Sequence, residues 1–128
     1  MFAEDARILV IDDEKEITEI VDAFLTTAGY EVAIENTAQG GVEKAKSFKP
    51  HLILLDIMMP GTDGYEVCNQ LKQDNATADI PVVFLTGKDA RDDRGRSFQA
   101  GCDLFVKKPF SCERLLDIVR IVLLSVSK

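Results

Sequence analysis

Short apolar runs alternate along the chain with stretches in which apolar residues recur every three or four positions. The runs predict strands at residues 7–11, 32–34, 52–55, 82–85 and 104–106. The longer spacing predicts amphipathic helices after each strand, including a charged helix over residues 89–100 and a last helix running to about Val126. Strands and helices joined by short connections build a parallel sheet covered on both faces, so we expect one α/β domain.

Several residues mark the limits of these elements. Gly29 stands where a left-handed residue ends the first helix, and Pro50 stops the second. Ser111 is placed to cap the last helix. The run at residues 52–55 is apolar at every position, which indicates a central strand buried on both faces.

Polar residues gather where the predicted strands end. Asp12 and Asp13 follow the first strand, Asp56 the third and Thr86 the fourth, and Lys108 comes just after the fifth. Ligands of doubly wound sheets bind beyond the carboxyl ends of the strands, near the point where the strand order reverses. We therefore expect three acids, a hydroxyl and an amine to open into one crevice.

Taken singly, most of these residues have a plainer explanation. Asp13 with Glu16 has the spacing of a capping box for the first helix. Thr86 could satisfy backbone donors that follow it, and Lys107 and Lys108 could be solvated. Asp56 is harder to explain in this way, because four apolar residues carry it to the edge of the core.

The acids taken together predict a bound cation. Carboxylates about 4 Å apart repel by about 4 kcal/mol at an effective dielectric constant near 20. Such a cluster raises its own pKa values or gathers a cation, and a site of few carboxylates suits Mg²⁺. A carboxylate relieved of this repulsion can act as a nucleophile toward phosphorus.

Composition narrows the function further. The 128 residues carry a net charge of −7, so we expect no direct contact with nucleic acid. No apolar run is long enough for a bilayer and the start lacks a secretion leader, which together predict a cytoplasmic protein without a membrane contact. Three cysteines, Cys68, Cys102 and Cys112, with one histidine lack zinc-site spacing and are expected to be reduced, packed thiols.

Four blocks in order carry a family resemblance: ILVIDDE (8–14), LILLDIMMPGTDG (52–64), VVFLTG (82–87) and GCDLFVKKPF (101–110). They strongly resemble the receiver domain of two-component response regulators, over essentially the whole chain. The resemblance implies a single receiver domain over residues 1–128, with a core of about 7–126. It also implies a doubly wound, five-stranded parallel sheet of flavodoxin-like type, in strand order 2-1-3-4-5.

The resemblance also implies roles for individual residues. Asp56 matches the phosphoacceptor, which receives its phosphoryl group from a histidine kinase or phosphotransfer domain. Asp13 matches a direct Mg²⁺ ligand, Asp12 the second acid of the pair, and the backbone carbonyl of Met58 a further ligand, beside Asp56 itself. Lys108, not Lys107, matches the lysine of the family, and the Lys108–Pro109 peptide is expected to be cis.

Further positions match those that transmit and time the signal. Thr86 matches the switch hydroxyl, and Gly87 leaves room for its approach to the phosphoryl group. Phe105 stands at the switch aromatic position, where many relatives have tyrosine, and it has no hydroxyl to donate. Met58 and Lys88 flank the path of hydrolytic water in similar domains. Because Met58 offers no polar group to orient water, we expect slow self-dephosphorylation.

The last helix leaves two interpretations open. Leu115, Ile118, Val119, Val122 and Val126 can cover the sheet, whereas Leu116, Ile121, Leu123 and Leu124 widen the apolar arc. The wide arc belongs either to a well-buried terminal helix or to a surface for a homodimer or an output domain. The charged fourth helix has few apolar anchors, so we expect the signal to leave through the fourth helix, the fifth strand and the fifth helix.

Three other classes of protein fit the sequence less well. Haloacid-dehalogenase-type phosphatases need a second acid two residues after the nucleophile, where this chain has Met58. A flavin carrier needs a phosphate cradle in the first loop, which Asp12 and Asp13 would repel. An interaction module that is never phosphorylated usually lacks one of the site residues, and none is missing here.

Overall fold

The computed structural model describes residues 6–87 and 104–126, and it contains alternating strands and helices. In chain order these are β1 (Arg7–Ile11), α1 (Lys15–Thr27), β2 (Glu31–Glu35), α2 (Ala38–Phe48), β3 (Leu52–Asp56), α3 (Gly64–Gln73), β4 (Val82–Thr86), β5 (Leu104–Lys107) and α5 (Cys112–Val126). The predicted helix over residues 89–100, Lys88 and Cys102 lie outside the described residues. Each of the five predicted strands is present, and β2, β3, β4 and β5 are each one or two residues longer than expected.

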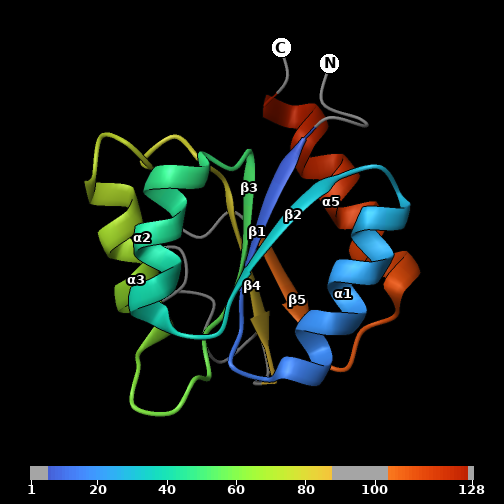
Figure 1. Cartoon of the computed structure of the whole chain (residues 1–128), viewed down its shortest axis with the longest axis horizontal. Helices are drawn as coiled ribbons and strands as arrows, with labels where there is room; N and C mark the ends of the chain where they lie inside the picture. The colour runs from blue at the N-terminus through green and yellow to red at the C-terminus, as the bar shows by residue number, and fades with distance from the viewer. Residues whose placement is uncertain (1–5, 88–103, 127–128) are drawn as a thin grey trace.

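The strands form one parallel sheet in the order β2-β1-β3-β4-β5, as expected. Helices α1 and α5 cover one face of this sheet, and α2 and α3 cover the other (Figure 1). Since all strands run in the same direction, their carboxyl ends meet at one edge, at the bottom of the view in Figure 1. Among the helices that the structure describes, none has the length and apolar character needed to cross a membrane.

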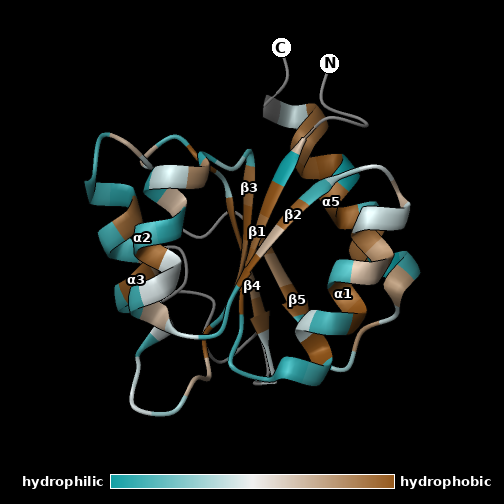
Figure 2. Ribbon diagram, viewed as in Figure 1, coloured by the Kyte–Doolittle hydropathy of each residue, from teal (hydrophilic) through white to brown (hydrophobic). Residues whose placement is uncertain are grey.

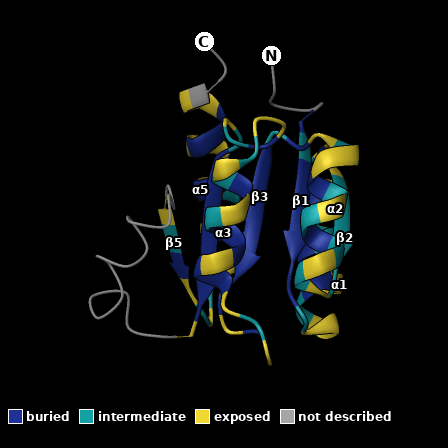
Figure 3. Cartoon of the chain, turned by 90° about the vertical axis from the view of Figure 1, so that its left-hand side faces the viewer, coloured by how far each residue is buried: buried dark blue, intermediate teal, exposed yellow. Residues whose placement is uncertain are grey.

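Alternation along the strands divides the core into two apolar clusters. Ile8 and Val10 of β1 pack toward α1 and α5, while Leu9 and Ile11 pack toward α2 and α3. The same division holds along β3, which is buried at every position and therefore apolar from Leu52 to Leu55. Figure 2 shows mostly hydrophobic strands between helices that carry both hydrophilic and hydrophobic residues, and Figure 3 shows β1 and β3 buried.

Most of the predicted element boundaries are confirmed. Gly29 has a φ of 103°, the left-handed conformation that follows a helix end and that glycine adopts without a steric cost. The Ser111 hydroxyl accepts a hydrogen bond from the Arg114 N–H at 3.0 Å, so Ser111 caps α5. The prediction of a capping box at the first helix is wrong. Glu14, not Asp13, occupies the N-cap position of α1, and its side chain makes no capping hydrogen bond.

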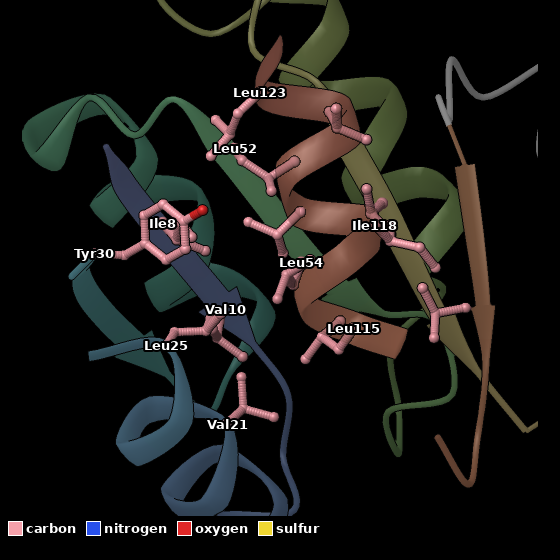
Figure 4. Close-up of a cluster of buried hydrophobic side chains, with 14 of the residues drawn as sticks. Ile8, Val10, Val21, Leu25, Tyr30, Leu52, Leu54, Leu115, Ile118 and Leu123 are labelled. Carbon is pink, nitrogen blue, oxygen red and sulfur yellow. The ribbon is translucent and has the colours of Figure 1, made fainter. Parts of the chain in front are cut away.

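Helix α5 packs with one face on the sheet and leaves other apolar residues in solvent. Leu115, Ile118, Val119 and Val122 are buried, as predicted. Leu123, which we assigned to the outer part of the arc, is 3% exposed and packs in the core, where Figure 4 shows it beside Leu52. A helix seated over a twisted sheet presents a wide face, so two adjacent residues both reach the core.

Two of the four residues in the outer part of the arc are mostly exposed. Ile121 and Leu124 are 63% and 69% exposed, and Leu116 is partly buried against the core. Leu104 of the neighbouring edge strand β5 is also exposed. Helix α5 is therefore not simply a buried terminal helix. The side chain of Val126 lies outside the described residues.

The two described cysteines take part in no disulfide. Cys68 is fully buried in the core cluster beneath α2 and α3, as expected for a packed thiol. Cys112, at the start of α5, is partly buried. Neither residue belongs to the group of acidic side chains described below.

Candidate functional site

The carboxyl edge of the sheet brings together residues that are far apart in the sequence. Asp12 directly follows β1, Asp56 ends β3, Thr86 ends β4, and Lys108 directly follows β5. Carboxylate oxygens of Asp12, Asp13, Glu14 and Asp56 all lie within 4.8 Å of one another. The three acids expected at the strand ends therefore do lie together, with Glu14 as one additional acid.

Asp12 is fully buried and is held by several hydrogen bonds. Its Oδ1 accepts the Glu14 N–H at 2.9 Å, which fixes the turn between β1 and α1. Its backbone N–H donates to the Glu35 carbonyl at 3.1 Å, and its own carbonyl accepts the Asn36 side-chain amide at 2.7 Å. The end of β2 thus holds the backbone of Asp12, and the remaining oxygen, Oδ2, points to Lys108.

Asp56 is 2% exposed and follows four buried residues. Its Oδ1 accepts the Met58 N–H at 2.9 Å, a turn that begins the loop after β3. Burial raises the pKa of the Asp56 carboxyl to about 6, and the charge of Asp12 adds to the rise. The Met58 N–H and the charge of Lys108 oppose this rise only in part. The carboxylate is thus costly to keep charged without a further cation.

Lys108 lies between these acids. Its Nζ is 2.8 Å from Asp12 Oδ2, 2.8 Å from Glu14 Oε1 and 3.5 Å from Asp56 Oδ2. Burial lowers the pKa of Lys108, but the hydrogen bonds to Asp12 and Glu14 outweigh burial, so its pKa is raised and the amine stays protonated. Lys107, in contrast, is exposed.

The backbone around Lys108 fixes where this side chain starts. The Lys108–Pro109 peptide is cis, as predicted. The Lys108 N–H donates to the Thr86 carbonyl at 2.7 Å, which joins the ends of β4 and β5. Lys108 and Thr86 therefore leave the sheet side by side.

Of the residues expected to transmit or time the signal, Thr86, Phe105 and Met58 are described, whereas Lys88 is not. Thr86 is 1% exposed, and open space surrounds the position where Gly87 would carry a side chain. The Phe105 ring is half-buried and packs edge to face against the Phe84 ring, with 6.2 Å between the ring centroids. Met58 is 52% exposed, and its own backbone N–H donates to Asp56 Oδ1.

The donor set fits a hard divalent cation. The clustered ligand atoms are carboxylate oxygens, which Mg²⁺ and Ca²⁺ prefer. The raised pKa of Asp56 and the close approach of buried Asp12 show that negative charge is crowded here. Since the α1 capping interpretation of Asp13 is wrong, its carboxylate is not used at the helix end.

Two residues near the site were missed in the sequence analysis. Glu14 follows the acid pair but gave no sign that its side chain would reach a lysine 94 positions away. Asn36 directly follows β2, and the rule that parallel strands end at one edge could have identified it. Both residues contact groups on which the site depends.

Comparison with known proteins agrees with this geometry. Residues 8–120 match the family model described as "Response regulator receiver domain". The chain is 41% identical over 117 residues to the DNA-binding dual master transcriptional regulator RpaA of Synechocystis sp., a match that covers 91% of the chain and 48% of the relative. It is 42% identical over 117 residues to the phosphate regulon transcriptional regulatory protein PhoB of Pseudomonas aeruginosa, covering 91% of the chain and 51% of the relative.

Solved structures agree as well. A CheY-like response regulator receiver domain from Methanospirillum hungatei superposes with a TM-score of 0.87 at 28% identity, covering 94% of each chain. The chain spans about half the length of the curated regulators named above. Receiver domains generally bind Mg²⁺ at an acidic pocket, and the described residues contain such a cluster. The matched blocks, the strand order and the acidic edge of the sheet together show that this chain belongs to the response regulator receiver domain family of two-component signalling.

Proposed function

We propose that the domain is a phosphorylation-dependent switch in which Asp56 accepts a phosphoryl group from a phosphohistidine of a histidine kinase or phosphotransfer domain. An Asp56 carboxylate oxygen forms a bond to phosphorus as the phosphorus–nitrogen bond breaks, and the electron pair of that bond stays on the imidazole. The observation that carries the proposal is the Asp56 carboxylate at the carboxyl edge of the sheet, with a cluster of acids and an amine around it and with a raised pKa.

Asp12, Asp13, Asp56 and the Met58 carbonyl would hold Mg²⁺ in this proposal. When bound, the ion offsets the negative charge between Asp56 and the incoming phosphoryl group. Asp56 needs no general base, because its ionised carboxylate attacks directly. The Met58 N–H orients Asp56 through its hydrogen bond to Oδ1.

Lys108 and Thr86 then stabilise the oxygens of the transferred group. The Lys108 amine is protonated and already lies 3.5 Å from Asp56 Oδ2, so a short movement brings it to a phosphoryl oxygen. Thr86 lies at the neighbouring strand end and offers a hydroxyl. Charge compensation and positioning supply most of the stabilisation in phosphoryl transfer.

We propose that the signal leaves through β5, α5 and the helix predicted over residues 89–100, which lies outside the described residues. A Thr86 hydroxyl drawn to the phosphoryl group frees space into which Phe105 can rotate, and this shifts an existing equilibrium between two conformations. The exposed Leu104, Ile121 and Leu124 lie on this side of the molecule and form the surface that a partner reads. Residues 1–128 act as one receiver domain, and an output domain or a second copy is the partner.

Phosphorylation by acetyl phosphate tests the proposal. We expect a Phos-tag mobility shift for the parent chain only when Mg²⁺ is present, and we expect hydroxylamine to remove it, as it does an acyl phosphate. The Asp56→Ala variant should show no shift, whereas Asp79→Ala, which removes an exposed aspartate elsewhere, should behave as the parent. A persistent shift in Asp56→Ala, or none in the parent, contradicts the proposal and favours an interaction module that is not phosphorylated.

A further inference from the structure

Lys108 makes its two short contacts away from the proposed phosphoacceptor. An ammonium group has three N–H donors. Two of them serve Asp12 Oδ2 and Glu14 Oε1, each at 2.8 Å, whereas the 3.5 Å separation from Asp56 Oδ2 exceeds the usual hydrogen-bond distance. The Lys108 amine is therefore closer to Asp12 and Glu14, which follow β1, than to Asp56, which ends β3.

The two short contacts differ in how firmly they are held. The Asp12 side chain is fully buried, and its other oxygen is fixed by the Glu14 N–H. The Glu14 side chain is 54% exposed, and it makes no capping hydrogen bond to α1. The Glu14 carboxylate can therefore leave Lys108 for water without disturbing the backbone, whereas the Asp12 carboxylate cannot.

A phosphoryl group on Asp56 requires a donor from Lys108. The ammonium can keep its hydrogen bond to Asp12 and turn toward Asp56 in two ways. It can give up the hydrogen bond to Glu14, or it can use its third N–H, whose direction is constrained by the bond to Glu14. The negative charge of Glu14 also competes directly with the negative phosphoryl oxygens for the same cation.

We propose that Glu14 is a positioning residue that restrains Lys108 before phosphorylation and so lowers the affinity of the site for a phosphoryl group. This inference rests on the proposed function and adds a control on the same site. The pair is partly solvated, and partly solvated ion pairs contribute modestly. Loss of the Glu14 charge should therefore strengthen binding of a phosphoryl mimic by about two- to fivefold.

Beryllofluoride titration at saturating Mg²⁺ tests the inference on Glu14→Gln. The matched control is Glu16→Gln, which removes the same charge from an exposed position in the first turn of α1. We expect tighter beryllofluoride binding in Glu14→Gln, parent affinity in Glu16→Gln, and a difference that shrinks at high salt because exposed pairs are screened. Glu14→Gln should unfold at a slightly lower urea concentration than Glu16→Gln, because it loses the ion pair with Lys108.

Nitrogen-15 NMR of the Lys108 side chain, without Mg²⁺ or beryllofluoride, gives a readout that helix stability does not change. The Lys108 Nζ resonance should shift in Glu14→Gln and not in Glu16→Gln. Equal beryllofluoride affinities in Glu14→Gln and the parent overturn the inference. So does a loss of Mg²⁺ affinity specific to Glu14→Gln, because it would assign Glu14 to the metal shell. A parent chain that binds no beryllofluoride contradicts the proposed function itself, whatever Glu14 does.

Discussion

At the scale of single residues, Asp56 shows how a functional group opposes stability. Its carboxylate is buried beside Asp12, and burial raises its pKa to about 6 from an ordinary value of 3.8. The folded state therefore holds this proton at pH values where the unfolded chain has released it. Stability that involves Asp56 falls as the pH rises from 3.8 to about 6, and the full penalty persists above that range.

Replacement of Asp56 by Asn should therefore stabilise the chain at neutral pH in the absence of Mg²⁺. We expect the free energy of unfolding at pH 7.5 to rise by about 1–3 kcal/mol, because a tenfold change in proton affinity corresponds to about 1.4 kcal/mol. Urea unfolding of both chains measures it. The gain should disappear near pH 4, where the parent carboxyl is protonated in the folded state. A variant less stable than the parent at pH 7.5 would contradict the conclusion that the buried charge of Asp56 destabilises the folded state.

Met58 supports a second prediction about a single side chain. It is 52% exposed and lies two residues beyond Asp56, and its thioether cannot orient water. Met58→Asn adds a donor and an acceptor at this position, so we expect phosphoryl loss about tenfold faster, equivalent to about 1.4 kcal/mol of barrier. Release of phosphate from the phosphorylated chain measures the rate. An unchanged or lower rate in Met58→Asn would count against shielding by Met58.

At the scale of elements, the loop from β3 to α3 depends on a close approach of two backbones. A Cβ on Gly64, the first residue of α3, would lie 2.3 Å from Ile57 Cα and 2.7 Å from Ile57 Cβ. The helix could accept a larger residue only by moving away from Ile57. Gly64 is therefore fixed by packing against Ile57, the residue that directly follows Asp56.

Gly64→Ala should destabilise the domain by about 1–3 kcal/mol, the usual cost of overpacking. The midpoint of urea unfolding should fall with an unchanged slope. Gly87→Ala is the control, because a Cβ there meets nothing within 4 Å. A Gly64→Ala chain as stable as Gly87→Ala would show that the start of α3 moves freely.

At the scale of the whole molecule, the exposed apolar residues of α5 are the clearest feature outside the site. Ile121 and Leu124 are mostly exposed, although the opposite face of the helix is buried. Contiguous exposed apolar surface in a small domain is usually covered by a partner. Strand β5, which carries the exposed Leu104, lies beside β4, the strand that ends in Thr86.

We expect beryllofluoride with Mg²⁺ to promote self-association of the chain through this surface. Replacing both Ile121 and Leu124 with Ser should weaken the dimer at least tenfold, because it removes about 1.4 kcal/mol or more of apolar burial. Sedimentation at several concentrations measures the mass. Ile20→Ser, at an exposed position of α1, is the control. A monomer mass at every concentration with beryllofluoride bound would contradict the dimer.

The sequence alone determined the fold class and the position of most of the candidate site. Strand and helix periods are local properties, and parallel strands must end at the same edge, so these two rules suffice to place Asp12, Asp56, Thr86 and Lys108 together. The tertiary structure decided that Leu123 is buried, that Asp13 does not cap α1, and that Glu14 binds Lys108. These outcomes depend on how each helix is rotated on the sheet and on where long side chains meet across the fold. Contacts between residues 94 positions apart leave no periodic trace in the sequence.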